Sequence, residues 1–243
     1  AFLFGLLFWS VIIYMYERIE GLIGTSALSK IQDSSVMIVG IGGVGGSAVE
    51  SLVRSGIGNI ILIDFDVVDI SNLNRQIITN MNVIGKKKVD VCIERIKDIN
   101  PNCKVIGLDL FLDFNNISDI LDKYKVDYII DSCDFVDAKK ALIKEAIKRN
   151  VKLITCLGTG NKLDPAKLKI TDIKKTFNDP LARKMRKWIK DEKITSKITV
   201  LCSEELPIKK GRVISSMCFV PNTAGIMLAN YVVMDIIKEF NYR

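Results

Sequence analysis

Hydrophobic and polar positions form a regular pattern in which short apolar runs alternate with longer amphipathic stretches. The short runs predict buried strands over residues 36–39, 59–63, 105–110, 126–130 and 151–156. The amphipathic stretches predict helices over residues 20–31, 47–55, 83–99, 117–123 and 138–149. Because strands and helices alternate, we predict an α/β protein with a doubly wound, mostly parallel sheet, whose ligand lies at the carboxyl ends of the strands.

The pattern changes after residue 160, where basic residues become frequent. Further elements are predicted there: strands over residues 168–173 and 198–202, a basic helix over residues 180–190 and a closing apolar helix over residues 222–240. We therefore divide the chain into an apolar leader (residues 1–17), a sheet-forming core (residues 18–160) and a C-terminal part (residues 161–243).

Composition narrows the chemistry that such a fold can carry. The 243 residues are enough for one hydrophobic core. No two of the six cysteines form a Cys-x-x-Cys pair, which indicates a reducing compartment and argues against a disulfide framework or a paired-cysteine zinc site. The chain has no histidine, so Ser-His-Asp and Cys-His catalysis are excluded, and acid–base work falls to Asp, Glu, Lys, water or the substrate.

The leader has its own set of interpretations. Residues 1–16 carry no charge and are mostly bulky and apolar. As a helix they would span about 24 Å, less than the ~30 Å hydrocarbon core of a bilayer. Three interpretations stay open: a membrane anchor with the basic domain facing the cytoplasm, a helix packed on the protein or on a dimer partner, and a signal peptide. We expect a cytoplasmic protein, with or without an anchor.

A glycine-rich turn follows the first strand, since residues 36–46 read VMIVGIGGVGG. Gly40, Gly42 and Gly45 have the spacing G-x-G-x-x-G, which permits a tight turn, a close approach of backbone to phosphate, and close packing of helix on strand. The helix N-terminus that follows presents free N–H groups to an anion. The second strand ends at Asp64, where a carboxylate would meet a ribose hydroxyl, so the sequence predicts a nucleotide site.

Other polar residues stand at strand ends or helix starts: Asp66, Asn72, Arg75, Lys88 and Asp134. Arg75 and Lys88 supply cations for a triphosphate, and Asp134 can hold Mg²⁺ together with phosphate oxygens. This set favours displacement at phosphorus over hydride transfer, because charge must be neutralised as pyrophosphate leaves. The alternatives are a solvated Lys88, an Arg75 in a structural ion pair, and an Asp64 that only caps a turn.

Positive charge is concentrated in one part of the chain. Residues 161–197 contain 12 lysines and arginines against 5 acidic residues, so this segment alone accounts for the net charge of +7. A basic block beside a nucleotide site favours a polyanionic partner, although a solvated helix face would have the same composition.

Several motifs resemble those of the adenylating superfamily, the ThiF family and its relatives, which includes the ubiquitin-activating enzymes and the bacterial enzymes that activate sulfur-carrier proteins. They are the glycine-rich turn, DFD at residues 64–66, NLNRQ at residues 72–76 and GKKK at residues 85–88. The resemblance implies that Gly43 contacts ATP, Asp64 the ribose, Arg75 and Lys88 the phosphates, and Asp134 a magnesium ion. In dimeric members the arginine can come from the neighbouring subunit, which is an open question for Arg75.

Within that superfamily the chain resembles the tRNA threonylcarbamoyladenosine dehydratases over residues 18–237. The most specific segments are RSGIG (54–58), INP (99–101), GTGNKLDP (158–165), TDI (171–173), DPLARK (179–184) and SEE (203–205). The sulfur-carrier activators usually carry two Cys-x-x-Cys pairs, which this chain lacks.

This resemblance implies a reaction on the modified adenosine beside the anticodon of tRNA. ATP and Mg²⁺ would adenylate its threonine carboxylate, a nitrogen of the same side chain would close a ring, and AMP would leave, with net loss of water. We expect a homodimer and tRNA contacts from the basic block: Lys174, Lys175, Arg183, Lys184, Arg186 and Lys187. The alternatives are adenylation of the C-terminus of a ubiquitin-like sulfur carrier, with an unknown sulfur-transfer partner, and a scaffold with a relic nucleotide site.

Overall fold

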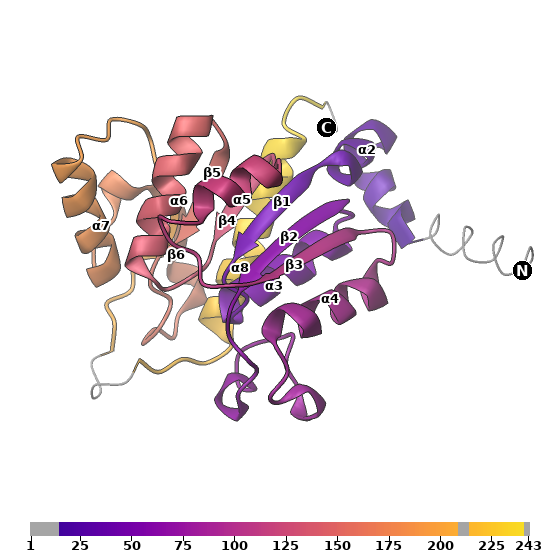
Figure 1. The fold of residues 1–243 in the computed structure, drawn as a ribbon, viewed down its shortest axis with the longest axis horizontal. Helices are drawn as coiled ribbons and strands as arrows, with labels where there is room; N and C mark the ends of the chain where they lie inside the picture. The colour runs from indigo at the N-terminus through magenta and orange to yellow at the C-terminus, as the bar shows by residue number, and fades with distance from the viewer. Residues whose placement is uncertain (1–14, 209–213, 241–243) are drawn as a thin grey trace, which may run out of the picture.

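The computed structural model describes residues 15–208 and 214–240. Within them lies a seven-stranded sheet of order β3-β2-β1-β4-β5-β7-β6, parallel except where β6 pairs with β7 (Figure 1). The strands are β1 (Ser35–Val39), β2 (Asn59–Asp64), β3 (Lys104–Asp109), β4 (Tyr128–Asp131), β5 (Lys152–Cys156), β6 (Leu168–Asp172) and β7 (Thr199–Ser203). The predicted α/β class and doubly wound sheet are confirmed, and every predicted strand is present.

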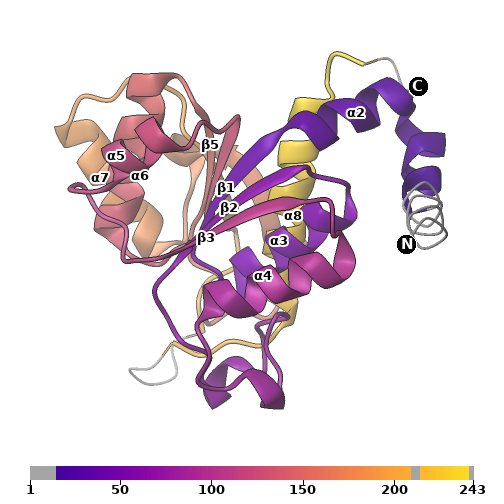
Figure 2. The ribbon, with the colours of Figure 1, turned by 45° about the vertical axis from the view of Figure 1, so that its right-hand side comes forward.

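Helices cover both faces of the sheet, as Figure 2 shows. One face carries α2 (Thr25–Asp33), α3 (Gly43–Arg54), α4 (Lys88–Ile99) and α8 (Phe219–Ile236), and the other carries α5 (Ile117–Lys123), α6 (Val136–Arg149) and α7 (Pro180–Asp191). Along β1, Val36 and Ile38 belong to the core under the first group, and Met37 and Val39 to the core under the second. Because both faces are buried there, the central strands β1, β2 and β4 are nearly continuous apolar runs in the sequence.

Two predicted helices begin or break at glycines with positive φ. The helix predicted over residues 20–31 is interrupted at Gly24, whose φ is 81°, and continues as α2. The helix predicted over residues 83–99 begins only at Lys88, because Gly85 has φ 82° and Val67 forms a β-bridge with Lys87. Residues Met81–Val83 form a 3₁₀ turn instead. The later start places Lys88 in the first turn of α4, next to the ends of the strands.

The strands of the C-terminal part extend the same sheet as those of the core, since β7 pairs with β5. The closing helix, α8, packs so tightly on α3 that a Cβ at Gly225 would lie 2.1 Å from the Val44 carbonyl oxygen. Its Pro221 lies in the first helical turn, where a backbone N–H is not needed. α8 therefore fixes the N-terminal end of α3, which is the phosphate end of the predicted site.

The leader predictions fall mostly outside the described residues, which begin at residue 15. Residues 15–23 are helical, and Tyr16 is buried against Gly56. In the parts of the chain that the structure describes, no helix is long and apolar enough to cross a bilayer. The interpretations of residues 1–14 stay predictions.

Candidate functional site

A cavity of about 1230 Å³ opens at the carboxyl ends of the strands, as the fold class predicts. Nine of the ten predicted nucleotide-site residues line it: Gly40, Gly42, Gly43, Asp64, Asp66, Asn72, Arg75, Lys88 and Asp134. The exception is Gly45, which lies under the turn. Residues that are up to 94 positions apart in the sequence are therefore brought together by the ends of β1, β2 and β4.

The glycine-rich turn has almost no room for side chains. Gly40 has φ 85°, and a Cβ there would lie 2.8 Å from the backbone nitrogen of Cys133. A Cβ on Gly45 would lie 1.8 Å from the carbonyl oxygen of Gly40. Gly45 thus lets α3 start directly against the turn, and the N-terminus of α3 at Gly43 opens into the cavity. The N–H groups of this first turn are available to an anion.

Asp64 at the end of β2 stabilises the same turn. One carboxylate oxygen accepts a hydrogen bond from the backbone N–H of Ile41 at 2.5 Å, and the other accepts one from the N–H of Asp66 at 2.8 Å. Burial raises the pKa of Asp64, and these bonds and the positive charge of Lys88 oppose that rise only in part. Asp64 therefore does cap the turn, and it also lines the cavity.

Lys88 is buried, with a side chain that is 6% exposed and a 2.7 Å ion pair to Asp66. Its neighbours point to other partners: Lys87 pairs with Asp109 at 2.6 Å, and Lys86 approaches Glu94 at 3.8 Å. The interpretation of Lys88 as a solvated lysine is therefore wrong. One cation of the GKKK motif is directed to the cavity, and the other two cover the surface.

Arg75 follows a 3₁₀ turn, Ile70–Asn72, in which the Asn72 side chain accepts the N–H of Asp69. The Arg75 guanidinium donates to the carbonyl of Ser71 at 2.7 Å and to the Asn74 side chain at 2.9 Å. Among the described residues it has no carboxylate within ion-pair distance, which contradicts the structural ion-pair interpretation. Its charge is available to a ligand.

Asn222 and Gln76 also contribute to this region; Asn222 was not found from the sequence, and Gln76 was noted only as part of the NLNRQ motif. With its amide assigned so that nitrogen faces acceptors, Asn222 of α8 donates to the carbonyls of Arg75 at 2.8 Å and Gly43 at 2.9 Å. It therefore joins the arginine segment to the phosphate end of α3. Gln76 lines the cavity and is buried, and its Oε1 has no hydrogen-bond partner within residues 15–208 and 214–240.

Asp134 is exposed and lies in the turn between β4 and α6. Ser132 holds that turn against the glycine-rich turn, because its hydroxyl donates to the carbonyls of Val39 at 2.9 Å and Gly40 at 2.7 Å. Within the described parts of the chain, no three metal-binding side chains lie together. Mg²⁺ commonly binds through one or two carboxylates plus phosphate oxygens, so a lone Asp134 fits a metal that arrives with its nucleotide.

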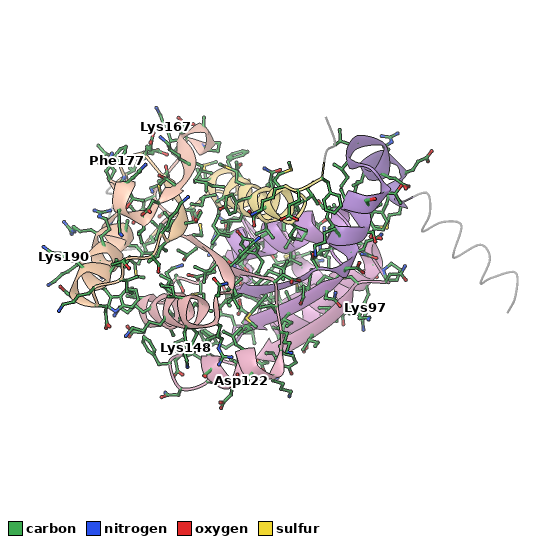
Figure 3. All side chains as sticks on the ribbon, turned by 90° about the horizontal axis from the view of Figure 1, so that it is seen from above. Lys97, Asp122, Lys148, Lys167, Phe177 and Lys190 are labelled. Carbon is green, nitrogen blue, oxygen red and sulfur yellow. The ribbon has the colours of Figure 1, made fainter. Side chains whose placement is uncertain are left out.

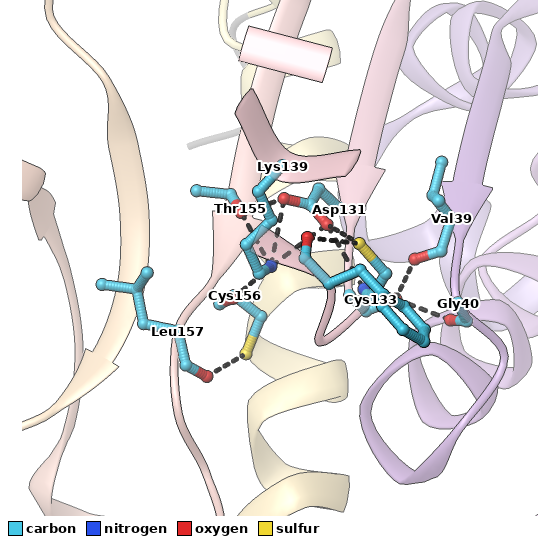
Figure 4. A network of polar contacts seen from close by, with 10 residues as sticks. Val39, Gly40, Asp131, Cys133, Lys139, Thr155, Cys156 and Leu157 are labelled. Atoms are coloured by element: carbon cyan, nitrogen blue, oxygen red, sulfur yellow. Dashed lines mark hydrogen bonds and ion pairs between the residues drawn. The ribbon is translucent and has the colours of Figure 1, made fainter. Parts of the chain in front are cut away.

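A buried ion pair between Lys139 and Asp131 holds the end of β4, from which the Asp134 turn starts (Figure 4). The Lys139 ammonium lies 3.1 Å from both oxygens of Asp131 and donates to the carbonyl of Cys156 at 2.7 Å, and both charged side chains are 0% exposed. Burial favours a lower pKa for Lys139, but the charge of Asp131 outweighs it and the pKa is raised. The Cys133 thiol donates to Asp131 at 3.0 Å, and burial raises its pKa, so it is a packed thiol and not a nucleophile.

The basic residues predicted to contact tRNA divide into three groups. Lys184 lines the cavity, and Lys174, Lys175, Arg183 and Lys187 are exposed. Arg186 is partly buried and donates to the carbonyl of Thr176 at 2.8 Å, so it holds the segment before α7. Figure 3 places this basic region, marked by Lys167 and Lys190, at the opposite end of the molecule from Lys97.

Comparison with known proteins identifies the family of the chain. The chain matches the model of the ThiF family over residues 16–201. A tRNA threonylcarbamoyladenosine dehydratase of Bacillus subtilis is 38% identical over 249 residues, covering 95% of this chain and 98% of that protein. The E. coli tRNA N6-threonylcarbamoyladenosine dehydratase, TcdA, in complex with ATP gives a TM-score of 0.88 at 33% identity, covering 93% of this chain and 95% of that one. Its complex with AMP gives 0.86 at 33% identity, covering 90% and 92%. The chain therefore belongs to the ThiF family and, within it, to the tRNA threonylcarbamoyladenosine dehydratases.

Proposed function

We propose that this protein uses ATP to cyclise N6-threonylcarbamoyladenosine in tRNA, by adenylating the threonine carboxylate. A carboxylate oxygen attacks the α-phosphorus and pyrophosphate leaves. A nitrogen of the same side chain then attacks the acyl carbon and AMP leaves, so the nucleoside loses one water. The observation that carries the proposal is the convergence of Asp64, Arg75, Lys88 and Asp134 on one cavity beside the N-terminus of α3. The relatives that match nearly the whole chain bear this activity in their names.

Each residue has a distinct task in this proposal. The N-terminus of α3 at Gly42 and Gly43 binds phosphate oxygens, and Asp64 accepts hydrogen bonds from the ribose. Arg75 and Lys88 neutralise charge as the bond between the α- and β-phosphates breaks. Asp134 would hold Mg²⁺ with the phosphate oxygens, where the metal would supply further charge neutralisation. No histidine is needed, because an acyl-adenylate is activated for intramolecular attack.

Adenylation of a sulfur-carrier protein is the less favoured activity. It would use the same cavity, but the six cysteines of this chain contain no Cys-x-x-Cys pair. Incubation with ATP and threonylcarbamoyladenosine-containing tRNA, followed by mass spectrometry of the nucleosides, separates the two. Loss of one water from the modified nucleoside supports the proposal. Pyrophosphate release with a carrier protein and no tRNA would instead support adenylation of the carrier protein.

The tRNA is proposed to lie over the exposed cations beside the cavity. These are Lys174, Lys175, Arg183, Lys184 and Lys187, of which Lys184 reaches the cavity itself. Arg186 would act indirectly, by holding the segment before α7. Lysine and arginine side chains of this kind bind the phosphates of the tRNA backbone, so the affinity for tRNA should fall steeply as the salt concentration rises.

We also propose that two copies of the chain associate through the surface around the Arg75 segment. Large apolar side chains are exposed there: Ile70 (63%), Ile77 (43%), Met81 (68%), Phe219 (57%) and Ile226 (52%). The two parts of this surface are neighbours, since Asn74 donates to the carbonyl of Ser216 at 2.9 Å. Exposed apolar patches of this kind mark protein contacts. Mixing inactive R75A and K88A variants tests whether Arg75 acts across the dimer, because only then does the mixture regain activity.

A further inference from the structure

The cavity extends beyond the proposed nucleotide site to a second wall. That wall consists of residues 157–162, after β5, and residues 179–181 and 184, at the start of α7. Asp131 at the end of β4 is the register partner of Thr155 in β5, so the turn after β5 is the next one along the sheet edge from the Asp134 turn. The nucleotide proposal assigns no task to this wall except at Lys184.

A buried ion pair holds one residue of this wall, Gly158, through both of its backbone polar groups. Lys162 and Asp179 both line the cavity, and each side chain is only 1% exposed. Asp179 accepts the N–H of Gly158 at 2.9 Å, and Lys162 donates to the carbonyl of the same glycine at 2.7 Å. The Lys162 ammonium lies 3.9 Å from the Asp179 carboxylate. Gly158 is therefore fixed through its N–H and its carbonyl together.

The same carboxylate also fixes the start of α7, because its second oxygen accepts the N–H of Ala182 at 3.0 Å. Asp179 thus has a hydrogen bond on each oxygen. Burial lowers the pKa of Lys162, and the charge of Asp179 offsets this only in part. Apolar side chains of similar volume often stabilise a buried site as well as an ion pair does. The pair is therefore better explained by the geometry that it imposes than by stability.

The residues that the pair positions are Thr159 and Gly160, which both line the cavity. Within the described part of the chain, neither backbone N–H has an acceptor, although Gly158 before them and Asn161 after them are both bonded. Consecutive N–H groups without an acceptor, on residues that line a cavity, are suited to an oxygen that carries negative charge.

We propose that Lys162 and Asp179 are positioning residues, which hold the N–H groups of Thr159 and Gly160 where they bind one oxygen of the substrate carboxylate. The inference rests on the proposed function. The other carboxylate oxygen attacks the α-phosphorus, and the bond to pyrophosphate breaks. When the side-chain nitrogen attacks the acyl carbon, it releases its proton to solvent, and AMP leaves with the oxygen that attacked. The held oxygen becomes the carbonyl oxygen of the acyl-adenylate in the first step, and the negative charge that builds on it during ring closure is stabilised by the same two N–H groups.

The test is the variant K162M, with K97M as a matched control, since Lys97 is exposed and lies far from this wall (Figure 3). Single-turnover reactions with saturating ATP measure pyrophosphate and cyclised nucleoside separately. We expect K162M to slow ring closure about tenfold or more and to release more pyrophosphate than it forms cyclised product, because an unheld acyl-adenylate is lost to water. Its ATP affinity should match that of wild type, whereas its Tm should fall, because Asp179 stays buried without its cation. A purely structural role would lower both products in proportion.

D179N is the second variant, and it decides the question if K162M does not fold. A folded variant with wild-type rates and equal yields overturns the inference. A loss confined to ATP affinity also overturns it, because it would place Lys162 on the nucleotide. These outcomes differ from a failure of the proposed function, in which the wild-type protein itself forms no AMP with modified tRNA.

Discussion

Replacement of Lys88 by methionine separates charge at the phosphates from support of the fold. The side chain is buried, and its polar partner in the described structure is Asp66, whose own side chain is 49% exposed. Methionine keeps the length and the apolar contacts of the lysine stem. Asp66 is left in contact with water, so we expect a loss of about 1 kcal/mol or less in the free energy of unfolding.

The expected loss of activity is much larger. In the proposed reaction Lys88 neutralises charge on the departing pyrophosphate. Removal of one such donor from an enzyme typically costs about 100- to 1,000-fold in kcat, which corresponds to about 2.7–4 kcal/mol. Activity and stability should therefore change by different amounts, whereas a structural role would change them together.

The assay is pyrophosphate release at saturating ATP and modified tRNA, with Tm measured on the same preparations. K87M is the matched control, because Lys87 is the preceding residue and its side chain is 54% exposed and paired with Asp109. We expect K87M to stay within about threefold of wild type, since it changes only a surface ion pair. A stable K88M protein with more than about a third of wild-type activity would refute the role of Lys88.

Three further predictions concern the turn, the buried lysine and the basic block. G45A should fail to bind ATP and should lose several kcal/mol of stability, because the new Cβ would lie 1.8 Å from the Gly40 carbonyl; a normal thermal melt would contradict this. The pKa of Lys162 is lowered in the folded protein, so the unfolded chain binds more protons than the folded one just below pH 10.5. The free energy of unfolding should therefore rise with pH in that window. Denaturant melts at several pH values should show this rise in wild type and not in K162M. A double variant of Lys184 and Lys187 should raise the KM for tRNA. The slope of log binding constant against log salt concentration should become shallower by about 0.7–0.9 for each tRNA phosphate that is no longer neutralised. An unchanged slope would show that these lysines do not contact tRNA.

The sequence was sufficient for the parts of the site that are built from local motifs. The strand, the glycine-rich turn and the helix start are adjacent in the chain, so their geometry follows from residue type and spacing. Asp64 could be placed because parallel strands end at one edge of a sheet, whereas Lys88 was placed by the resemblance of the GKKK motif. Helix starts were less well predicted, since a positive φ at Gly24 and Gly85 is not visible in a hydrophobic pattern.

The groups that support these motifs depend on contacts between distant segments. Lys139 looks like one more polar position of an amphipathic helix, yet it is fully buried on Asp131. Lys162 and Asp179 are 17 residues apart, and their link through Gly158 exists only once β5 and α7 are packed together. Asn222 reaches the Arg75 segment because α8 crosses α3. Such contacts are set by tertiary packing and have no signature in a single sequence.

The central claim is that a substrate carboxylate oxygen attacks the α-phosphorus of ATP. It is tested most directly by tRNA whose threonine carboxylate carries a heavy-oxygen label, incubated with the protein and Mg-ATP in ordinary water. The account predicts AMP that contains one labelled oxygen, formed in equal amount with a nucleoside that has lost one water. Unlabelled AMP, or cyclised nucleoside without AMP, would contradict it.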